Sequence, residues 1–427
     1  MVHLGDICKI NGAEIEPVWC ITGGSPCQDL SIAGKRAGLA GARSGLFMEQ
    51  VRIVKEIREA DKRNGRTGNM ARPRFLVWEN VVGAFSSNRG KDFAAVLEEI
   101  ARIAEPGFSL SGLPKKWKWT KAGAIDGDGW SIAWRTHDAK DWGKTIRDSR
   151  TGNVIRLGTP QRRRRISVVA DFGGESAAQI QFDRESVSGH PAESGAAGER
   201  AAEAAESGVN PSVTDVTTYC LQGNGIDRAD TGGCNGKGWK ADESYTLNTI
   251  DRPAVVALDM THACDVIREC GEQVPALQAR MGTGGNQVPL TYGIGNGQAN
   301  EDAETYPEQN MVVRRLTPME CERLQGFQSG WTDIGEWIDE KGKKHKDADS
   351  PRYKALGNSI ALPFWDWMLR RMARYLPEGA TLGSLFDGIA GYPLIWERIH
   401  GKGTARWASE IEPFPIAVTK KHFPEEE

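Results

Sequence analysis

Residues 381–410 read TLGSLFDGIAGYPLIWERIHGKGTARWASE, and this stretch decides the fold. Its apolar run Thr381–Phe386 predicts a buried strand, which a glycine-rich turn joins to a helix over Pro393–His400. A second predicted strand, Thr404–Ser409, ends at Glu410. A glycine-rich turn between a strand and a helix brings backbone N–H groups close to a ligand, and an acid after the next strand can bind a ribose diol. The stretch therefore predicts either such a ligand site or an ordinary strand–helix unit with a surface glutamate.

The first 172 residues continue the alternation of strands and helices. Strands are predicted over Val18–Thr22, Phe75–Trp78 and Ile166–Ala170, and helices over Gly45–Ala60 and Asp92–Ala104. Alternation of this kind is typical of a mostly parallel sheet that helices cover on both faces. The predicted fold class is therefore α/β.

Composition divides the rest of the chain. After the first α/β segment comes a stretch rich in Gly, Ala, Ser and Glu, which predicts a linker. A region with many glycines and short β-like runs follows, and Thr317-Pro318-Met319-Glu320 then has the pattern of a helix start. The predicted segments are an α/β domain in two parts, 1–172 and 378–427, a linker, 173–217, a small β-rich domain, 218–313, and a helical segment, 314–377.

The 427 residues are enough for two or three domains. The formal net charge is −3, from 54 basic and 57 acidic residues, which weakly disfavours a nucleic-acid partner. The charge is uneven, however, because Arg162–Arg165 are consecutive, and local patches decide contact with phosphate.

No apolar run approaches the ~20 residues that span a bilayer and no signal peptide is evident, so we expect a cytoplasmic protein. None of the eight cysteines forms a CxxC pair, so no zinc site is expected.

Three short motifs carry groups that can do chemistry. A thiol in a turn between a strand and a helix, as at Cys27, can become a nucleophile, although a lone cysteine is more often a small buried residue. Glu79 follows a buried strand and can stay protonated in a dry pocket, with a solvated strand-end glutamate as the alternative. In Gln161–Arg165, alternation along a strand points two arginines one way and two the other, with a solvated basic edge as the alternative.

Taken together, these elements resemble the cytosine carbon-5 methyltransferase family, and the resemblance covers nearly the whole chain. It implies a Rossmann-like, S-adenosylmethionine-dependent methyltransferase sheet with a second, smaller β-rich target-recognition domain. The family's motifs occur here as Gly5-Asp6-Ile7, Pro26-Cys27-Gln28, Glu79-Asn80-Val81, Gln161 to Arg165, Arg315 to Phe327, Gly357-Asn358-Ser359 and Phe386 to Gly391.

Three features depart from the family pattern. Ala390 replaces a usual glycine in the cofactor loop, and Lys144–Gly158 is inserted before the arginine motif, with a hairpin turn predicted at Thr151-Gly152-Asn153. The motif order also differs, because this chain starts at the Gly-Asp-Ile motif and ends with the cofactor loop and Glu410. That order is a circular permutation, for which one α/β domain built from both ends of the chain is expected.

The resemblance implies a DNA (cytosine-5)-methyltransferase that flips a cytosine out of the duplex and methylates its carbon 5. Cys27 is the expected nucleophile, Glu79 the group that binds the base, and Arg165, with Arg163, the group that orients Glu79. S-adenosylmethionine is the expected cofactor, and no metal is expected. The expected cofactor-binding residues are Asp6, Ile7, Pro26, Asn358, Ser359, Phe386, Asp387, Gly388, Ile389, Ala390, Gly391, Glu410 and Ile411.

The expected partner is double-stranded DNA, and a cognate restriction endonuclease is a possible second partner. The protein is expected to be a monomer from a prokaryote or a phage. The glycine-rich loop before Val288 is either a recognition loop or a plain turn. An RNA cytosine methyltransferase acting on tRNA and a catalytically impaired DNA-binding relative stay open as other functions. The expected DNA contacts are Gln28, Ser31, Gly34, Lys35, Arg162, Thr283, Asn286 and Gln287.

Overall fold

The chain folds into two compact units in the computed structural model. The first comprises Met1–Gln181, Gln273–Gly284 and Arg315–Glu427, and the second comprises Phe182–Glu272 and Gly285–Arg314. The structure describes residues 1–25, 45–110, 119–147, 154–158, 161–182, 219–221, 239–241, 258–259, 268–269, 290–294 and 311–425.

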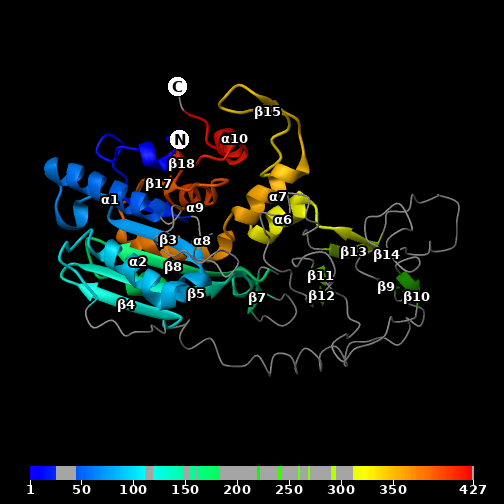
Figure 1. Ribbon diagram of the computed structural model, residues 1–427, viewed down its shortest axis with the longest axis horizontal. Coiled ribbons are helices and arrows are strands. Elements are labelled where there is room, and N and C mark those ends of the chain that lie inside the picture. Colours follow the sequence, from blue (N-terminus) through cyan, green and yellow to red (C-terminus); the bar gives the residue numbers. More distant parts are fainter. Residues whose placement is uncertain are drawn as a thin grey trace. The chain divides into compact units, whose positions relative to one another are not determined.

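An eight-stranded sheet forms the centre of the first unit (Figure 1). Five neighbouring strands are parallel, and the last three of the sheet are antiparallel to their neighbours. The prediction of an α/β fold is confirmed, and the sheet is mostly parallel. In spatial order the strands are β1 (Val2–His3), β18 (Ala405–Ser409), β17 (Leu382–Leu385), β2 (Cys20–Gly23), β3 (Phe75–Val81), β8 (Arg164–Asp171), β5 (Trp130–Asp138) and β4 (Ala122–Gly127).

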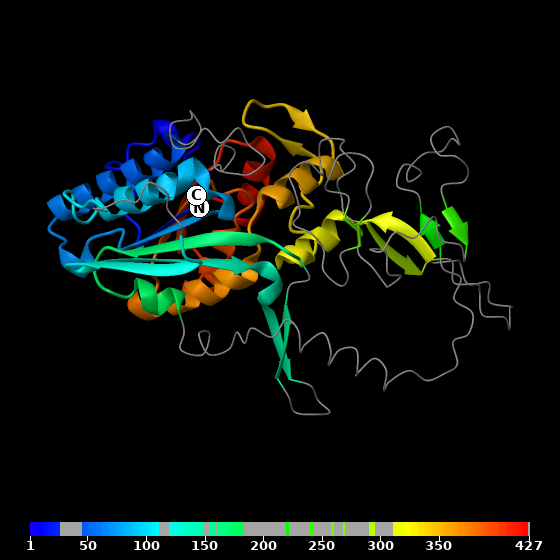
Figure 2. The ribbon, with the colours of Figure 1, turned by 60° about the horizontal axis from the view of Figure 1, so that its bottom comes forward.

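Helices cover both faces of this sheet. On one face, α1 (Gly45–Arg63) and α2 (Lys91–Ala101) pack their apolar sides against strand residues such as Leu76 and Trp78, which have at most 1% of their surface exposed. Figure 2 shows α1 and α2 on that face and α8 (Leu362–Met372) on the other. The remaining helices are α3 (Ala177–Gln181), α6 (Pro318–Gln325), α7 (Asp349–Asn358), α9 (Gly391–His400) and α10 (Pro413–His422), with 3₁₀ turns η1 (Ile7–Lys9), η3 (Gly68–Met70), η4 (Val82–Phe85), η5 (Ser87–Gly90), η6 (Ala139–Asp141) and η9 (Ala373–Tyr375).

Local signals predicted the helix α6 correctly. Thr317 is its N-cap and Glu320 closes a capping box, while Gly326 ends the helix in the left-handed conformation. The inserted hairpin is also confirmed, since β6 (Gly143–Arg147) pairs antiparallel with β7 (Val154–Gly158). Its predicted turn lies outside the described residues.

Long-range pairing accounts for what the sequence predicted wrongly. Strand β3 runs to Val81 because it pairs along its whole length with β8, so Glu79 lies inside the strand and not after it. The strands β4 and β5 were not predicted at all. Helix α3 lies where the linker was predicted to start, and the first compact unit includes the chain through Gln181.

Segments from the two ends of the chain complete one edge of the sheet. Strand β1 pairs in parallel with β18, and the Leu4 amide donates a hydrogen bond to the Ala408 carbonyl oxygen at 2.7 Å. The Met1 ammonium donates to the Pro424 carbonyl oxygen at 3.1 Å. The two termini therefore lie close together (Figure 1).

Short antiparallel strands make up the described part of the second unit. Two of them form one pair and the others a four-stranded sheet, whose last strand ends at Arg315 in the first unit. A further pair, β15 (Trp337–Ile338) and β16 (Lys344–His345), lies in the first unit. Within the described ranges, no helix has the length and apolar character needed to cross a membrane. The strands of the second unit are β9 (Tyr219–Leu221), β10 (Trp239–Ala241), β11 (Leu258–Asp259), β12 (Arg268–Glu269), β13 (Leu290–Ile294) and β14 (Met311–Arg315).

Candidate active site

An ion pair between neighbouring strands marks one end of the site. Glu79 on β3 and Arg165 on β8 approach each other with an Nε–Oε1 distance of 2.8 Å, and 15% and 18% of their side chains are exposed. The pairing of Val81 with Arg165 in the antiparallel ladder sets this geometry. The pair is therefore partly buried, and the arginine fixes the carboxylate in one orientation.

The backbone that leads to Cys27 packs against Glu79 and its neighbours. A Cβ atom on Gly24 would lie 2.9 Å from Glu79 Oε2, so any larger residue there would displace the carboxylate. The Trp78 indole N–H donates to Ser25 Oγ at 3.0 Å, and the Asn80 amide donates to the Ser25 carbonyl oxygen at 3.4 Å. The segment is thus held beside the carboxylate up to two residues before Cys27.

The predicted alternation of the arginine run is confirmed by burial. Arg162 and Arg164 are exposed, whereas Arg163 is 3% exposed and Arg165 contacts Glu79. Arg163 differs from the expectation that it orients Glu79. Its guanidinium donates to the carbonyl oxygens of Gly357, at 3.1 Å, and Ser359. Arg163 therefore supports the turn of the Gly-Asn-Ser motif.

The cofactor loop after β17 has an unusual backbone conformation. Phe386 and Ala390 have φ angles of 54° and 62°, in the left-handed region that non-glycine residues rarely adopt, and Gly388 has 60°. Ala390 is the N-cap of α9, and its side chain is fully buried. The loop thus takes the conformation that a family glycine would favour, although alanine occupies the position.

Glu410 lies directly beside this loop. Its Oε2 accepts a hydrogen bond from the Gly388 amide at 2.9 Å, and its Oε1 accepts from the amides of Ile411 and Glu412 at 2.8 and 3.0 Å. Next to it, Ser409 Oγ donates to the Gly5 carbonyl oxygen at 2.7 Å. That contact brings the segment of Asp6 alongside the segment of Glu410.

Asp387 is a carboxyl group buried in the loop, with 7% of its surface exposed. Burial, with a smaller contribution from the nearby Glu410, raises its pKa to about 7, although hydrogen bonds from Ser384 and Thr419 oppose the shift. Thr419 Oγ1 donates to Oδ2 at 3.2 Å, whereas Oδ1 has no partner among the described residues. Asp387 is therefore a buried carboxyl group with one oxygen left unsatisfied inside the loop by the described residues.

The other expected cofactor residues differ in exposure. Ile7, Ser359 and Ile389 are buried, Asn358 is exposed at the end of α7, and Ile411 is 66% exposed. Asp6 caps η1 by accepting a hydrogen bond from the Cys8 amide at 3.0 Å. An exposed apolar side chain beside acidic oxygens and backbone amides fits a ligand that has both an aromatic base and a ribose, as S-adenosylmethionine does.

Several of the predicted site residues lie outside the described residues, so the distances given above do not involve them. They are Pro26, Cys27, Gln28, Ser31, Gly34, Lys35, Thr283, Asn286 and Gln287.

Sequence reasoning missed two groups that border the site. Ser25 anchors the nucleophile segment, and the signal for it was its place next to the Pro-Cys-Gln motif. Tyr392 is 5% exposed on α9, and burial, with a contribution from Glu79, raises its pKa well above the usual range. A tyrosine at the start of a buried helix gives no local sign that it belongs to a site.

The comparison with protein families identifies the class of protein that this geometry represents. The family model described as C-5 cytosine-specific DNA methylase matches residues 1–109 and 150–374. The chain belongs to this family.

Individual relatives are more distant. The chain is 28% identical over 440 residues to a protein of Escherichia phage P1 named DNA N-6-adenine-methyltransferase, with 88% of this chain and 55% of the relative covered. It is 23% identical over 368 residues to the type II methyltransferase M2.BsuMI of Bacillus subtilis, with 86% and 62% covered. The chain thus spans between about half and two thirds of the length of these relatives. A solved methyltransferase structure from Entamoeba histolytica is 12% identical, with a TM-score of 0.38 over 84% of this chain and 78% of that one.

Proposed function

We propose that this protein is a DNA (cytosine-5)-methyltransferase that transfers a methyl group from S-adenosylmethionine to a flipped cytosine in duplex DNA. The observation that carries the proposal is the Glu79–Arg165 pair, held beside the segment that leads to Cys27 in a chain of this family. A carboxyl group, a guanidinium and a thiol are the groups that activation of a cytosine ring requires.

The proposed reaction begins when the Cys27 thiolate adds to carbon 6 of the flipped base, because carbon 5 is too weak a nucleophile unaided. Glu79 binds N3 and the exocyclic amine and supports the charge that develops on the ring, while Arg165 holds the carboxyl group in place. When bound, S-adenosylmethionine supplies the electrophilic methyl group. Loss of the carbon-5 proton then expels the Cys27 thiolate and restores the aromatic ring.

The proposed cofactor site consists of the loop Phe386–Gly391, Glu410 and Asp6. The Glu410 carboxylate is an acceptor for ligand hydroxyl groups. Ile411 offers apolar surface for the adenine ring. The turn Asn358-Ser359, which Arg163 supports, completes the proposed set.

For DNA recognition we propose residues 218–313 as the target-recognition domain and Gln28, Ser31, Gly34 and Lys35 as DNA contacts. Arg162 is exposed, as a phosphate contact requires. The proposal includes a monomer that acts in the cytoplasm, with a cognate restriction endonuclease as a partner.

We also propose that the chain is a circular permutation of the family's usual order. Counted from the cofactor strand β17, the parallel strands β17, β18, β1, β2 and β3 are first to fifth, and their spatial order is then 3-2-1-4-5. This is the order of doubly wound dinucleotide-binding sheets, which bind ligands at the switch point next to the first strand. Here that point lies between β17 and β2, where the cofactor loop and the segment to Cys27 begin.

Transfer of a labelled methyl group tests the proposed function. Duplex DNA and tRNA are incubated separately with the protein and methyl-labelled S-adenosylmethionine, and the digested nucleosides are separated by chromatography. The proposal predicts label in 5-methyldeoxycytidine only. Label in N6-methyldeoxyadenosine, the product suggested by the phage P1 relative's name, or in tRNA alone would overturn it.

A further inference from the structure

The left-handed backbone of the cofactor loop needs support from outside the loop. Phe386 and Ala390 both have positive φ angles without being glycines, a conformation that persists only where surrounding contacts enforce it. Within the loop, the Ala390 amide donates to the Asp387 carbonyl oxygen at a long 3.3 Å. The loop's own hydrogen bond is therefore long at Ala390, one of the two strained positions.

Trp331 supplies a contact from another part of the chain at this point. Its indole N–H donates a hydrogen bond of 2.9 Å to the carbonyl oxygen of Ile389, the residue before Ala390. The indole is 5% exposed and stacks on the His422 ring, with 3.6 Å between centroids and an interplanar angle of 3°. His422 Nε2 in turn donates to the Trp331 carbonyl oxygen at 2.8 Å.

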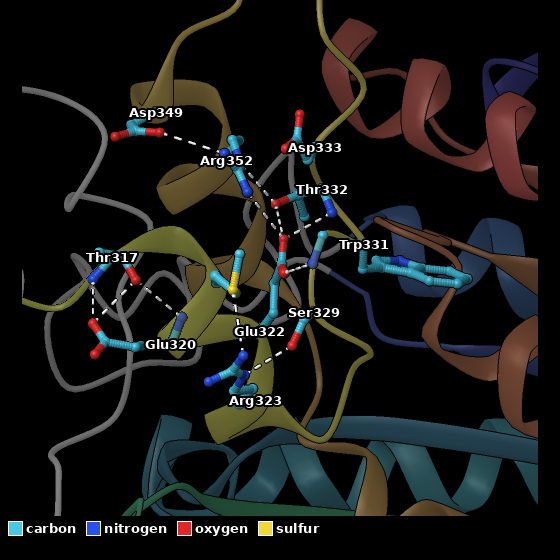
Figure 3. Close-up of polar contacts among 12 residues, drawn as sticks. Thr317, Glu320, Glu322, Arg323, Ser329, Trp331, Thr332, Asp333, Asp349 and Arg352 are labelled. Carbon is cyan, nitrogen blue, oxygen red and sulfur yellow. Dashed lines mark hydrogen bonds and ion pairs between the residues drawn. The ribbon is translucent and has the colours of Figure 1, made fainter.

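A buried carboxylate holds the residues on both sides of Trp331. Glu322 on α6 is fully buried, and its oxygens accept hydrogen bonds from the Gly330 amide at 2.6 Å and the Thr332 amide at 2.8 Å. Arg352 on α7 lies 3.4 Å from the same carboxylate and offers it a counter-charge. In Figure 3, dashed lines join the Glu322 carboxylate to Thr332 and to Arg352, and Trp331 lies to one side.

We propose that Trp331 is a positioning residue for S-adenosylmethionine binding, and that Glu322 is the anchor that fixes it. The indole N–H locks the Ile389 carbonyl and so holds Gly388 and Ala390, on either side of it, in the left-handed conformation that shapes the cofactor loop. The inference rests on the proposed function only in naming the ligand, because the contacts that support the loop lie within the protein itself. Both residues would act through the loop.

A matched pair of tryptophan substitutions tests this role. Trp331→Phe keeps an aromatic ring for His422 and removes the N–H donor. Trp396→Phe is the control, since Trp396 is fully buried on α9 and donates a 2.8 Å hydrogen bond to Ala380, at the start of the cofactor strand and away from the loop. Calorimetry then measures the dissociation constant of S-adenosylmethionine, and amide hydrogen exchange follows Gly388 and Ala390 without cofactor.

We expect Trp331→Phe to weaken S-adenosylmethionine binding about 3- to 10-fold, the loss of one buried hydrogen bond, and to speed exchange of the loop amides. Glu322→Gln replaces the carboxylate by a neutral amide. We expect it, too, to weaken S-adenosylmethionine binding and to speed exchange of the loop amides. Trp396→Phe lowers the unfolding midpoint and leaves both readouts unchanged. An unchanged dissociation constant in Trp331→Phe, or equal changes in both tryptophan variants, would overturn the proposal. If the wild-type protein does not bind S-adenosylmethionine, the proposed function fails. The exchange rates of Gly388 and Ala390 would still show whether Trp331 supports the loop.

Discussion

The two halves of the sheet's carboxyl edge hold their functional groups by different means. At the cofactor half, formed by β17, β18 and β1, main-chain groups of the loop are fixed by several hydrogen bonds, among them those from Gly388 to Glu410 and from Trp331 to Ile389. At the base half, formed by β2, β3 and β8, one ion pair orients one carboxylate. Because the first half shares its task among many contacts, single changes there should weaken function by degrees. Single changes at the base half should abolish it.

The largest effect is expected at the base half, from Cys27→Ser. A hydroxyl is a far weaker nucleophile than a thiolate near neutral pH, so methylation should fall below detection. Gel-shift titration with duplex DNA should show affinity within a few-fold of the wild-type protein. Cys8→Ser, at an exposed cysteine on η1, is the control and should retain activity. Substantial turnover by Cys27→Ser would remove the nucleophile from the account.

The next effect in size should come from Glu79→Gln. An amide keeps the shape of the side chain but cannot carry the charge or proton that ring activation needs, so turnover should fall about 10²- to 10⁴-fold. The dissociation constant of S-adenosylmethionine should stay the same, because the cofactor half is untouched. A rate loss below tenfold would remove Glu79 from the proposed mechanism, and an equal loss of cofactor affinity would show that the two halves do not work separately.

A graded effect is expected at the cofactor half from Glu410→Ala. Loss of a charge-assisted hydrogen bond should weaken S-adenosylmethionine binding about 10- to 100-fold in calorimetry. Glu412→Ala is the matched control, because Glu412 is exposed and its ion pair with Lys354 contributes little. If the two variants bind the cofactor equally well, the ribose is held elsewhere.

The buried Asp387 should make stability depend on pH. Its pKa rises from 3.8 to about 7 on folding, so the folded protein keeps the proton that the unfolded chain releases, and stability falls as pH rises from about 4 to 7. The Asp387→Asn variant has no titrating group at this position, so its stability should not show this decline with pH. Urea unfolding at pH 4.5 and 7.5 should show the variant gaining on the wild-type protein by on the order of 2 kcal/mol across this range. Parallel stability curves would contradict the assignment.

The smallest effect is expected from rearranging the gene, which tests whether the cofactor half is one site built from both chain ends. A gene that starts at Thr381, joins Glu425 to Val2 and ends near Leu376 should give an enzyme with activity within a few-fold of the original. The Met1–Pro424 contact already brings the joined ends together. A folded product without affinity for S-adenosylmethionine would refute the permutation.

Local chemistry explains which parts of this site could be read from sequence. The capping box at Thr317 and the glycine-rich turn at Gly388 depend on neighbours in the chain, and both elements were predicted. The contacts that were missed join distant residues: Arg163 binds Gly357, and Trp331 binds Ile389. Strand β5 was missed although Asp128-Gly129 is a hairpin signal, because its register depends on the distant β8.

Covalent trapping tests the central claim most directly. Duplex DNA that carries 5-fluorocytosine in the target sequence should form a denaturation-resistant complex with the wild-type protein in the presence of S-adenosylmethionine, because fluorine cannot leave as a proton does. Mass spectrometry of the digested complex should place the modified base on the peptide that contains Cys27, and Cys27→Ser should form no complex. A complex that persists in Cys27→Ser, or an adduct at another residue, would contradict the account.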